Sequence, residues 1–262
     1  MLDEKYEKLK KLILAQGSVV VAFSGGVDST VLAKVSYDVL GQRAAAVTLD
    51  SKTIPRRELA DAIKLAKKIG IKHKVLPHSE LASEEFSRNP EDRCYYCKKE
   101  LSQALKDYAG VHGFDAVLEG TNASELCGHR PGARALFEEG VLSPLAGAGF
   151  SKQDVRELAV RLGLPNAGKP SAACLSSRIP YGQRISKEGL GRVEAAEDYL
   201  KGIGVAQVRV RLHGDVARIE AEPEDFSLIL DARERLAERF VEIGFKYVAL
   251  DLLGYRSGSM NE

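Results

Sequence analysis

The sequence predicts an α/β fold in which a doubly wound parallel sheet is followed by a smaller C-terminal α+β domain. Short apolar runs alternate with helical patterns through the first 170 residues, as they do in chains of βαβ units. A glycine turn separates the first apolar run from its helix. After residue 182 the pattern changes to two neighbouring strands flanked by helices, which indicates a separate domain.

The spacing of apolar residues predicts the elements in order. In the first domain we expect helices and strands in the order helix 3–16, strand 19–23, strand 44–49, helix 57–69, strand 72–76, strand 115–119 and helix 151–163. In the second we expect helix 187–202, strand 207–212, strand 216–221, helix 224–242 and strand 247–252. The predicted domain limits are 1–170 and 183–262, joined by an interdomain loop at 171–182.

Composition and charge exclude several classes of protein. The 262-residue chain has a net charge of +1, which argues against a nucleic-acid partner. It contains no apolar run of 18 residues, and its N-terminus is charged, so we expect a cytoplasmic protein with no membrane partner. Four cysteines in such a protein predict metal or redox chemistry and not structural disulfides.

The stretch Ser24-Gly25-Gly26-Val27-Asp28-Ser29 lies between the first predicted strand and its helix. Glycines at a strand-to-helix turn let the backbone approach a phosphate, and the helix N-terminus favours an anion. The serines add hydroxyl donors, and Asp28 adds a carboxylate for magnesium. No Gly-Lys-Ser/Thr follows, so this is not the Walker pattern. An ordinary tight turn is the alternative, but these side chains favour ATP binding.

The carboxyl ends of parallel strands meet at one edge of a sheet, so polar residues at those ends should share one site. For Thr121 and Asn122, helix capping is the alternative explanation. The residues that we expect to bind ATP are Ala22, Phe23, Ser24, Gly25, Gly26, Asp28, Ser29, Leu49, Asp50, Gly120 and Thr121.

Three of the four cysteines are candidate ligands. Cys94 and Cys97 form a Cys-x-x-Cys, a spacing that lets both sulfurs bind one ion from a turn, although a buried structural pair is the alternative. Cys174 lies in the interdomain loop, where Arg178 and Lys169 are expected to stabilise its thiolate. Cys127 either completes a four-ligand zinc site or is incidental, and we favour an incidental residue.

A predicted strand of the second domain carries two arginines on one face. Arg209 and Arg211 alternate along it, and Glu220 and Glu222 share a face of the next strand. Cross-strand ion pairs are one interpretation. The other is that the arginines bind a substrate phosphate or carboxylate, for which a planar guanidinium is well suited.

The SGGxDS turn is similar to the signature of the PP-loop ATP pyrophosphatases, which have an adenine nucleotide alpha hydrolase-like (HUP) fold. Two further stretches, Arg130–Ala135 and Ala173–Gly182, make the chain resemble the LarE family. These are ATP-dependent sulfur transferases of nickel-pincer nucleotide cofactor biosynthesis, which serves lactate racemase maturation. The resemblance extends over about residues 3–255 in element order.

This resemblance implies a reaction and a set of site residues. The family adenylates a carboxylate of pyridinium-3,5-biscarboxylic acid mononucleotide, releasing pyrophosphate, and then converts it to a thiocarboxylate with release of AMP. One branch sacrifices the sulfur of a single cysteine, which corresponds to Cys174. Because Cys94 and Cys97 are also present, the chain resembles the branch with a [4Fe-4S] cluster on three cysteines. Three thiolates leave one iron able to carry sulfide.

The same resemblance implies ATP and Mg²⁺ as reactants at the glycine turn, with Asp28 as the magnesium ligand. Asp28, Cys174, Arg209 and Arg211 are then the expected catalytic residues, and the arginines bind the anionic mononucleotide. The family also implies a homo-oligomer, specifically a hexamer. The sequence therefore leaves two sulfur sources open, the sacrificed Cys174 and sulfide carried on a cluster.

Three other functions fit parts of the sequence. A PP-loop tRNA thiolase also combines ATP with cysteines, but it would need a broad basic face. An amidating enzyme such as an NAD or GMP synthetase would not need the cysteines. A zinc- or cluster-stabilised nucleotide sensor would bind ATP without catalysis, and release of pyrophosphate separates it from all the enzymes.

Overall fold

The computed structural model describes residues 1–126, 131–170 and 173–256. These residues form two compact units, the first from Met1–Glu80 and Asp92–Ala172 and the second from Leu81–Glu91 and Ala173–Glu262. The chain therefore passes between the units three times. Our sequence-based division had a single crossing near residue 170, and it did not anticipate that the segment 81–91 belongs to the second unit.

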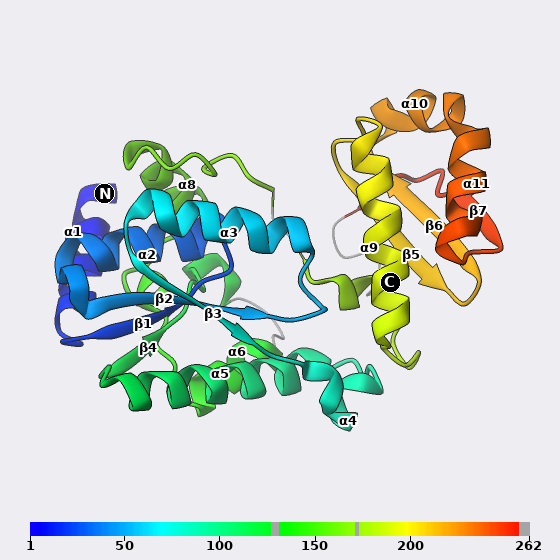
Figure 1. The fold of residues 1–262 in the computed structure, drawn as a ribbon. Coiled ribbons are helices and arrows are strands. Elements are labelled where there is room, and N and C mark those ends of the chain that lie inside the picture. The colour runs from blue at the N-terminus through cyan, green and yellow to red at the C-terminus, as the bar shows by residue number, and fades with distance from the viewer. Residues whose placement is uncertain (127–130, 171–172, 257–262) are drawn as a thin grey trace. The chain divides into compact units, whose positions relative to one another are not determined.

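Four parallel strands form the sheet of the first unit, in the order β3-β2-β1-β4 (Figure 1). Their bounds are β1 Val19–Ala22, β2 Ala44–Asp50, β3 Lys72–Pro77 and β4 Ala116–Leu118. Val19 is in register with Ala44 on one side and with Ala116 on the other. The carboxyl ends of all four strands lie at the same edge, so the predicted doubly wound sheet is confirmed.

Helices cover both faces of this sheet, with α5 and α6 on the face opposite to α1, α2, α3 and α8 (Figure 1). Val19 and Val21 pack in one layer, and Val20 packs in the other, which explains the uninterrupted apolar run. The helices are α1 Leu2–Leu14, α2 Val27–Leu40, α3 Arg56–Ile69, α5 Arg93–His112, α6 Pro131–Glu138, α7 Pro144–Gly147 and α8 Lys152–Arg161, with 3₁₀ turns η1 Gly41–Arg43, η2 Glu80–Ala82 and η3 Ala123–Glu125.

The second unit contains a three-stranded mixed sheet in the order β5-β6-β7. β5 and β6 are antiparallel, whereas β6 and β7 are parallel. Helix α9 packs on β5, and α11 packs on β7 and α9. The elements are α4 Glu84–Ser87, η4 Leu175–Arg178, α9 Lys187–Gly202, β5 Val208–His213, β6 Val216–Ala221, η5 Pro223–Asp225, α10 Phe226–Asp231, α11 Arg233–Ile243 and β7 Tyr247–Leu250.

Two predicted boundaries differ from the structure. The single helix expected over 224–242 is divided into η5, α10 and α11, with Ala232 between the two α-helices. The Cys-x-x-Cys, expected in a turn, lies inside helix α5, which begins at Arg93. Within the described part of the chain, no helix is long and apolar enough to cross a membrane.

Candidate functional site

The glycine turn occupies the carboxyl end of β1, the central strand next to β2 and β4. Helix α2 begins at Val27, directly after Gly26, which has an extended backbone and no side-chain cap. Gly25 has a φ of +71°, and a Cβ at this position would lie 3.0 Å from the Cα of Ala62. Both facts require glycine here. The turn therefore presents backbone N–H groups at the start of a 14-residue helix, which is an arrangement suited to phosphate.

Side chains of the turn itself and of one distant residue fix its conformation. The hydroxyl of Ser29 donates to the carbonyl oxygen of Gly26 over 3.1 Å, and the hydroxyls of Ser24 and Ser29 lie 3.1 Å apart. The buried Asn166 donates from Nδ2 to the carbonyl oxygen of Gly25 over 3.1 Å. These hydrogen bonds fix the conformation of the turn, and phosphate binding there stays a prediction.

The carboxylate of Asp28 accepts hydrogen bonds from two other segments of the first unit. Its Oδ1 accepts a 3.0 Å hydrogen bond from Nδ2 of Asn122, which follows β4, and its Oδ2 accepts one from Nζ of Lys152, the first residue of α8. A Cβ at Gly120 would lie only 2.9 Å from the backbone N of Ser29, so the end of β4 also lies close to the turn.

Sequence reasoning missed Lys152, whereas it placed Asn122 among the polar strand-end residues expected to share one site, with helix capping as the alternative. A signal was available for Lys152, because a cation in the first turn of a helix opposes the helix dipole and needs another partner. For Asn122 the signal was its position after a predicted strand, although its hydrogen bond to Asp28 was not predicted. Its side chain is fully buried, and its Oδ1 has no hydrogen-bond partner within the described chain.

The other predicted nucleotide-binding residues lie at the same sheet edge or directly behind it. Asp50 ends β2 and accepts a hydrogen bond from Arg56. Leu49 is buried, and Thr121 donates from its hydroxyl to Glu119 over 2.8 Å. The carbonyl oxygen of Phe23, after Ala22 at the end of β1, accepts a 2.6 Å hydrogen bond from the hydroxyl of Thr48 on β2.

Cys94 and Cys97 are the second and fifth residues of α5, three residues apart. Residues at this spacing project from the same side of a helix, with Cβ atoms about 5–6 Å apart. Cys94 is exposed and Cys97 is half-buried. Gly132 of α6 lies against Cys94, where an added Cβ would be 3.7 Å from the Cβ of the cysteine. The two thiols therefore share an accessible surface next to α6.

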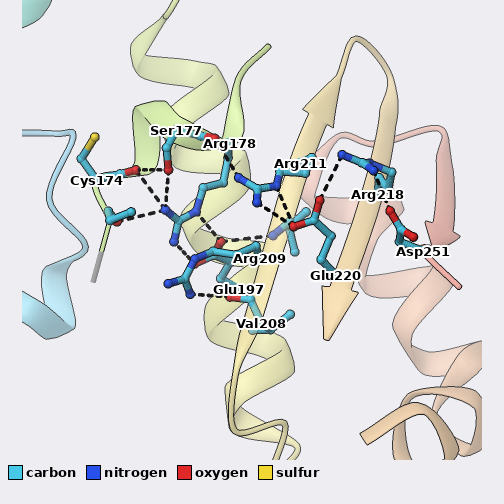
Figure 2. A network of polar contacts seen from close by, with 12 residues as sticks. Cys174, Ser177, Arg178, Glu197, Val208, Arg209, Arg211, Arg218, Glu220 and Asp251 are labelled. Atoms are coloured by element: carbon cyan, nitrogen blue, oxygen red, sulfur yellow. Dashed lines mark hydrogen bonds and ion pairs between the residues drawn. The ribbon is translucent and has the colours of Figure 1, made fainter. Parts of the chain in front are cut away.

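Cys174 belongs to the second unit, where it is exposed and precedes η4. Nη1 of the buried Arg178 donates to the carbonyl oxygens of Ala173 and Cys174 over 2.9 and 3.0 Å. The rest of this guanidinium binds Glu197 over 2.8 and 3.1 Å. Figure 2 shows the sulfur directed away from this network. Arg178 thus holds the backbone beside Cys174, which corrects our expectation that it acts on the thiol.

A metal site is not assembled among the described residues of this structure, in which no three His, Cys, Asp or Glu side chains lie together in a metal-binding group. Cys127, the alternative ligand in the sequence, lies outside the described residues. The three predicted cluster ligands are divided between the units, because Cys94 and Cys97 belong to the first and Cys174 to the second.

Comparison with known proteins identifies the family. A family model described as NAD synthase matches residues 4–183. A pyridinium-3,5-bisthiocarboxylic acid mononucleotide synthase of Lactiplantibacillus plantarum is 40% identical over 245 residues, which cover 93% of this chain and 89% of that protein. The chain belongs to the LarE family. An uncharacterised protein of Synechocystis sp. is 44% identical over 263 residues, covering 100% of this chain and 98% of that protein.

In this LarE-family chain, the two predicted substrate-binding arginines are 7% and 5% exposed on β5. Arg211 donates from Nη2 and Nε to Glu220 over 2.6 and 3.0 Å, and from Nη1 to the carbonyl oxygen of Ser177 over 2.8 Å (Figure 2). Glu220 also binds Arg218 over 3.0 Å. The cross-strand ion pair is therefore present, and substrate binding by Arg211 stays a prediction.

Arg209 lies on the same strand of the LarE-family chain, beside the Arg178–Glu197 pair (Figure 2). Its guanidinium carbon is 5.3 Å from the centre of the Tyr255 ring, and Nη1 donates to the carbonyl oxygen of Val208 over 2.9 Å. Burial, followed by the charge of Arg178, lowers the pKa of Arg209. Such a cation gains from an additional anionic partner, which is consistent with the predicted role.

Proposed function

We propose that this protein adenylates a carboxylate of pyridinium-3,5-biscarboxylic acid mononucleotide and replaces the activated oxygen by sulfur. The supporting observation is the 40% identity, over 93% of the chain, to a synthase named for the bisthiocarboxylic acid product. A match that covers both units supports the complete reaction, since nucleotide binding alone would require only the first unit.

The glycine turn is assigned to ATP. Its backbone N–H groups and the dipole of α2 face the pyrophosphate portion, while an oxygen of the substrate carboxylate attacks the α-phosphorus. The bond between the α-phosphorus and the bridging oxygen breaks, and pyrophosphate leaves with the electron pair. The products of this step are an acyl-adenylate and pyrophosphate.

Magnesium is assigned to Asp28 on the chemistry of its donor atoms. Carboxylate oxygens are preferred Mg²⁺ ligands, and Asp28 already holds a cation, the ammonium group of Lys152. Bound Mg²⁺ would neutralise charge on the phosphates. With the ion bound to Asp28, the ammonium group of Lys152 would be available to the departing pyrophosphate. Asn122 keeps the carboxylate oriented throughout.

The sulfur step is assigned to Cys94, Cys97 and Cys174. Two thiols on one side of a helix, with the exposed Cys174 as third ligand, fit a [4Fe-4S] cluster as its protein donors. Such a cluster, when bound, would supply sulfide as the nucleophile. Attack of sulfide on the acyl carbon forms the C–S bond, and AMP leaves with the electron pair of the broken C–O bond. Arg209 and Arg211 are assigned to the anionic groups of the mononucleotide.

We also propose a cytoplasmic location, where thiols remain reduced, and a homo-oligomer, specifically a hexamer, on the family resemblance. No observation favours nucleic acid as a partner, since the net charge is only +1.

The proposed function is tested by incubating the anaerobically purified protein with Mg–ATP, the dicarboxylate mononucleotide and either sulfide or ammonia. We expect pyrophosphate, AMP and a thiocarboxylate with sulfide, and no amide with ammonia. Cys174→Ser should release pyrophosphate but form no thiocarboxylate. An amide product would instead assign the chain to the amidating PP-loop enzymes. Absence of pyrophosphate release would leave only a nucleotide-binding protein.

A further inference from the structure

Asn89 has an unusual combination of backbone strain and burial. Among the described residues it is the one non-glycine residue with a positive φ, at 58°. Its side chain is 0% exposed. Asparagine tolerates the left-handed region better than most residues, but the conformation still requires support from its surroundings. A strained asparagine that is fully buried therefore points to a specific role for the side chain.

The side chain of Asn89 fastens a turn that is far away in the sequence. Nδ2 lies 3.2, 2.8 and 3.0 Å from the carbonyl oxygens of Ile179, Pro180 and Gln183. Its two hydrogens thus serve three acceptors that converge on one point. The backbone continues the attachment, because the N–H of Gly182 donates to the carbonyl oxygen of Asn89 over 2.9 Å.

This turn is the far end of the segment that carries Cys174. The near end is held by Arg178, which binds the carbonyl oxygens of Ala173 and Cys174 and is itself paired with Glu197 on α9. The segment is therefore fixed at both ends, from α9 and from Asn89. Asn89 and the segment 173–183 both belong to the second unit, so all of these hydrogen bonds lie within that unit.

We propose that Asn89 is a positioning residue for sulfur transfer, which fixes the Ile179–Gln183 turn and thereby the location of Cys174 within the second unit. The inference rests on the proposed function, because it presumes that Cys174 takes part in the sulfur step. It assigns no role to Asn89 in adenylation, whose residues lie in the first unit. Misplacing a reacting group by about 1 Å is enough to slow a reaction strongly.

The test compares Asn89→Gly with a matched control, Arg184→Gln, in the full-length protein purified without oxygen. Glycine adopts the positive φ and removes only the amide. Arg184 joins the same two segments through an exposed ion pair with Glu84 at 2.7 Å. We expect Asn89→Gly to release pyrophosphate within about twofold of the wild-type rate while thiocarboxylate formation falls at least about tenfold. Arg184→Gln should leave both rates unchanged.

The inference is overturned if thiocarboxylate formation by Asn89→Gly equals that of the wild type. It is also overturned if both rates fall together, because Asn89 then only maintains the fold. Should Asn89→Gly fail to fold, Asn89→Asp is measured between pH 5.5 and 8. Protonation of the buried aspartate restores one donor, so its sulfur-transfer rate should recover as the pH falls, and lack of recovery refutes the inference. If Cys174→Ser forms thiocarboxylate normally, the assignment of Cys174 to the sulfur step is refuted, whereas a wild-type protein that forms no thiocarboxylate would refute the proposed function itself.

Discussion

Replacement of Glu197 by glutamine tests the buried network of the second unit. Glu197 and Arg178 are each 2% exposed and make two charged hydrogen bonds to each other. Removing one partner of a buried ion pair costs about 3–5 kcal/mol, because the other charge stays buried. Arg178 retains three oxygen acceptors, the carbonyl oxygens of Ala173 and Cys174 and the hydroxyl of Ser177, so we expect the lower end of this range.

If the unfolding free energy falls by about 2 kcal/mol for each M of urea, a loss of about 3 kcal/mol in that free energy lowers the urea midpoint by about 1.5 M. Because the chain has two units, unfolding of the second is followed through amide exchange of α9 as a function of urea. Glu188→Gln is the control, since Glu188 lies exposed on the same helix. It should change the unfolding free energy by less than about 0.5 kcal/mol.

If Glu197→Gln lowers the unfolding free energy by less than about 1 kcal/mol, this reasoning is refuted. Glu197 would then not be the main partner of the buried Arg178 charge. Glu197→Leu combined with Arg178→Met offers a second check. Replacing both charges by apolar groups removes the unpaired ion, so the double variant should be more stable than Glu197→Gln. A double variant that is less stable than Glu197→Gln would also contradict the account.

Three further predictions concern other residues. Asp28→Asn should slow pyrophosphate release about 10²–10³-fold, as loss of one electrostatic group at a reacting centre does, and an unchanged rate would exclude Asp28 from the mechanism. Arg211→Ala should raise the KM for the mononucleotide more than that for ATP, whereas equal KM effects would leave Arg211 only its ion pair with Glu220. The pKa of Asp154 is lowered to about 2, mainly by its hydrogen bond from Lys5. Its carboxylate therefore stabilises the fold above about pH 4, and this contribution is lost as the pH falls toward 2, so Asp154→Asn should flatten the decline of Tm in that window.

Local patterns were sufficient to predict much of the first unit. The apolar run Val19–Val21 lies between two helical layers, and the glycines after it form a strand-to-helix turn, as their spacing indicates. The polar ends of neighbouring strands meet at one edge because parallel strands share a direction. These features depend on residues that are close in the sequence or on the general geometry of parallel sheets.

Contacts between distant segments were not predictable from these patterns. Lys152 meets Asp28 across 124 residues, and Asn89 meets Ile179 across 90. Periodicity shows which residues share a face of an element, but it does not show which other segment packs there. For the same reason, the spacing of Arg209 and Arg211 predicted a shared face but not how deeply β5 is buried.

The central claim is that the chain transfers sulfur to an ATP-activated carboxylate without consuming Cys174. The most direct test is the peptide-resolved mass of Cys174 after anaerobic turnover with Mg–ATP, the dicarboxylate mononucleotide and excess sulfide. The account predicts several thiocarboxylates per chain and an unchanged cysteine. Formation of at most one thiocarboxylate per chain, with Cys174 converted to dehydroalanine because its sulfur has left in the product, would contradict it.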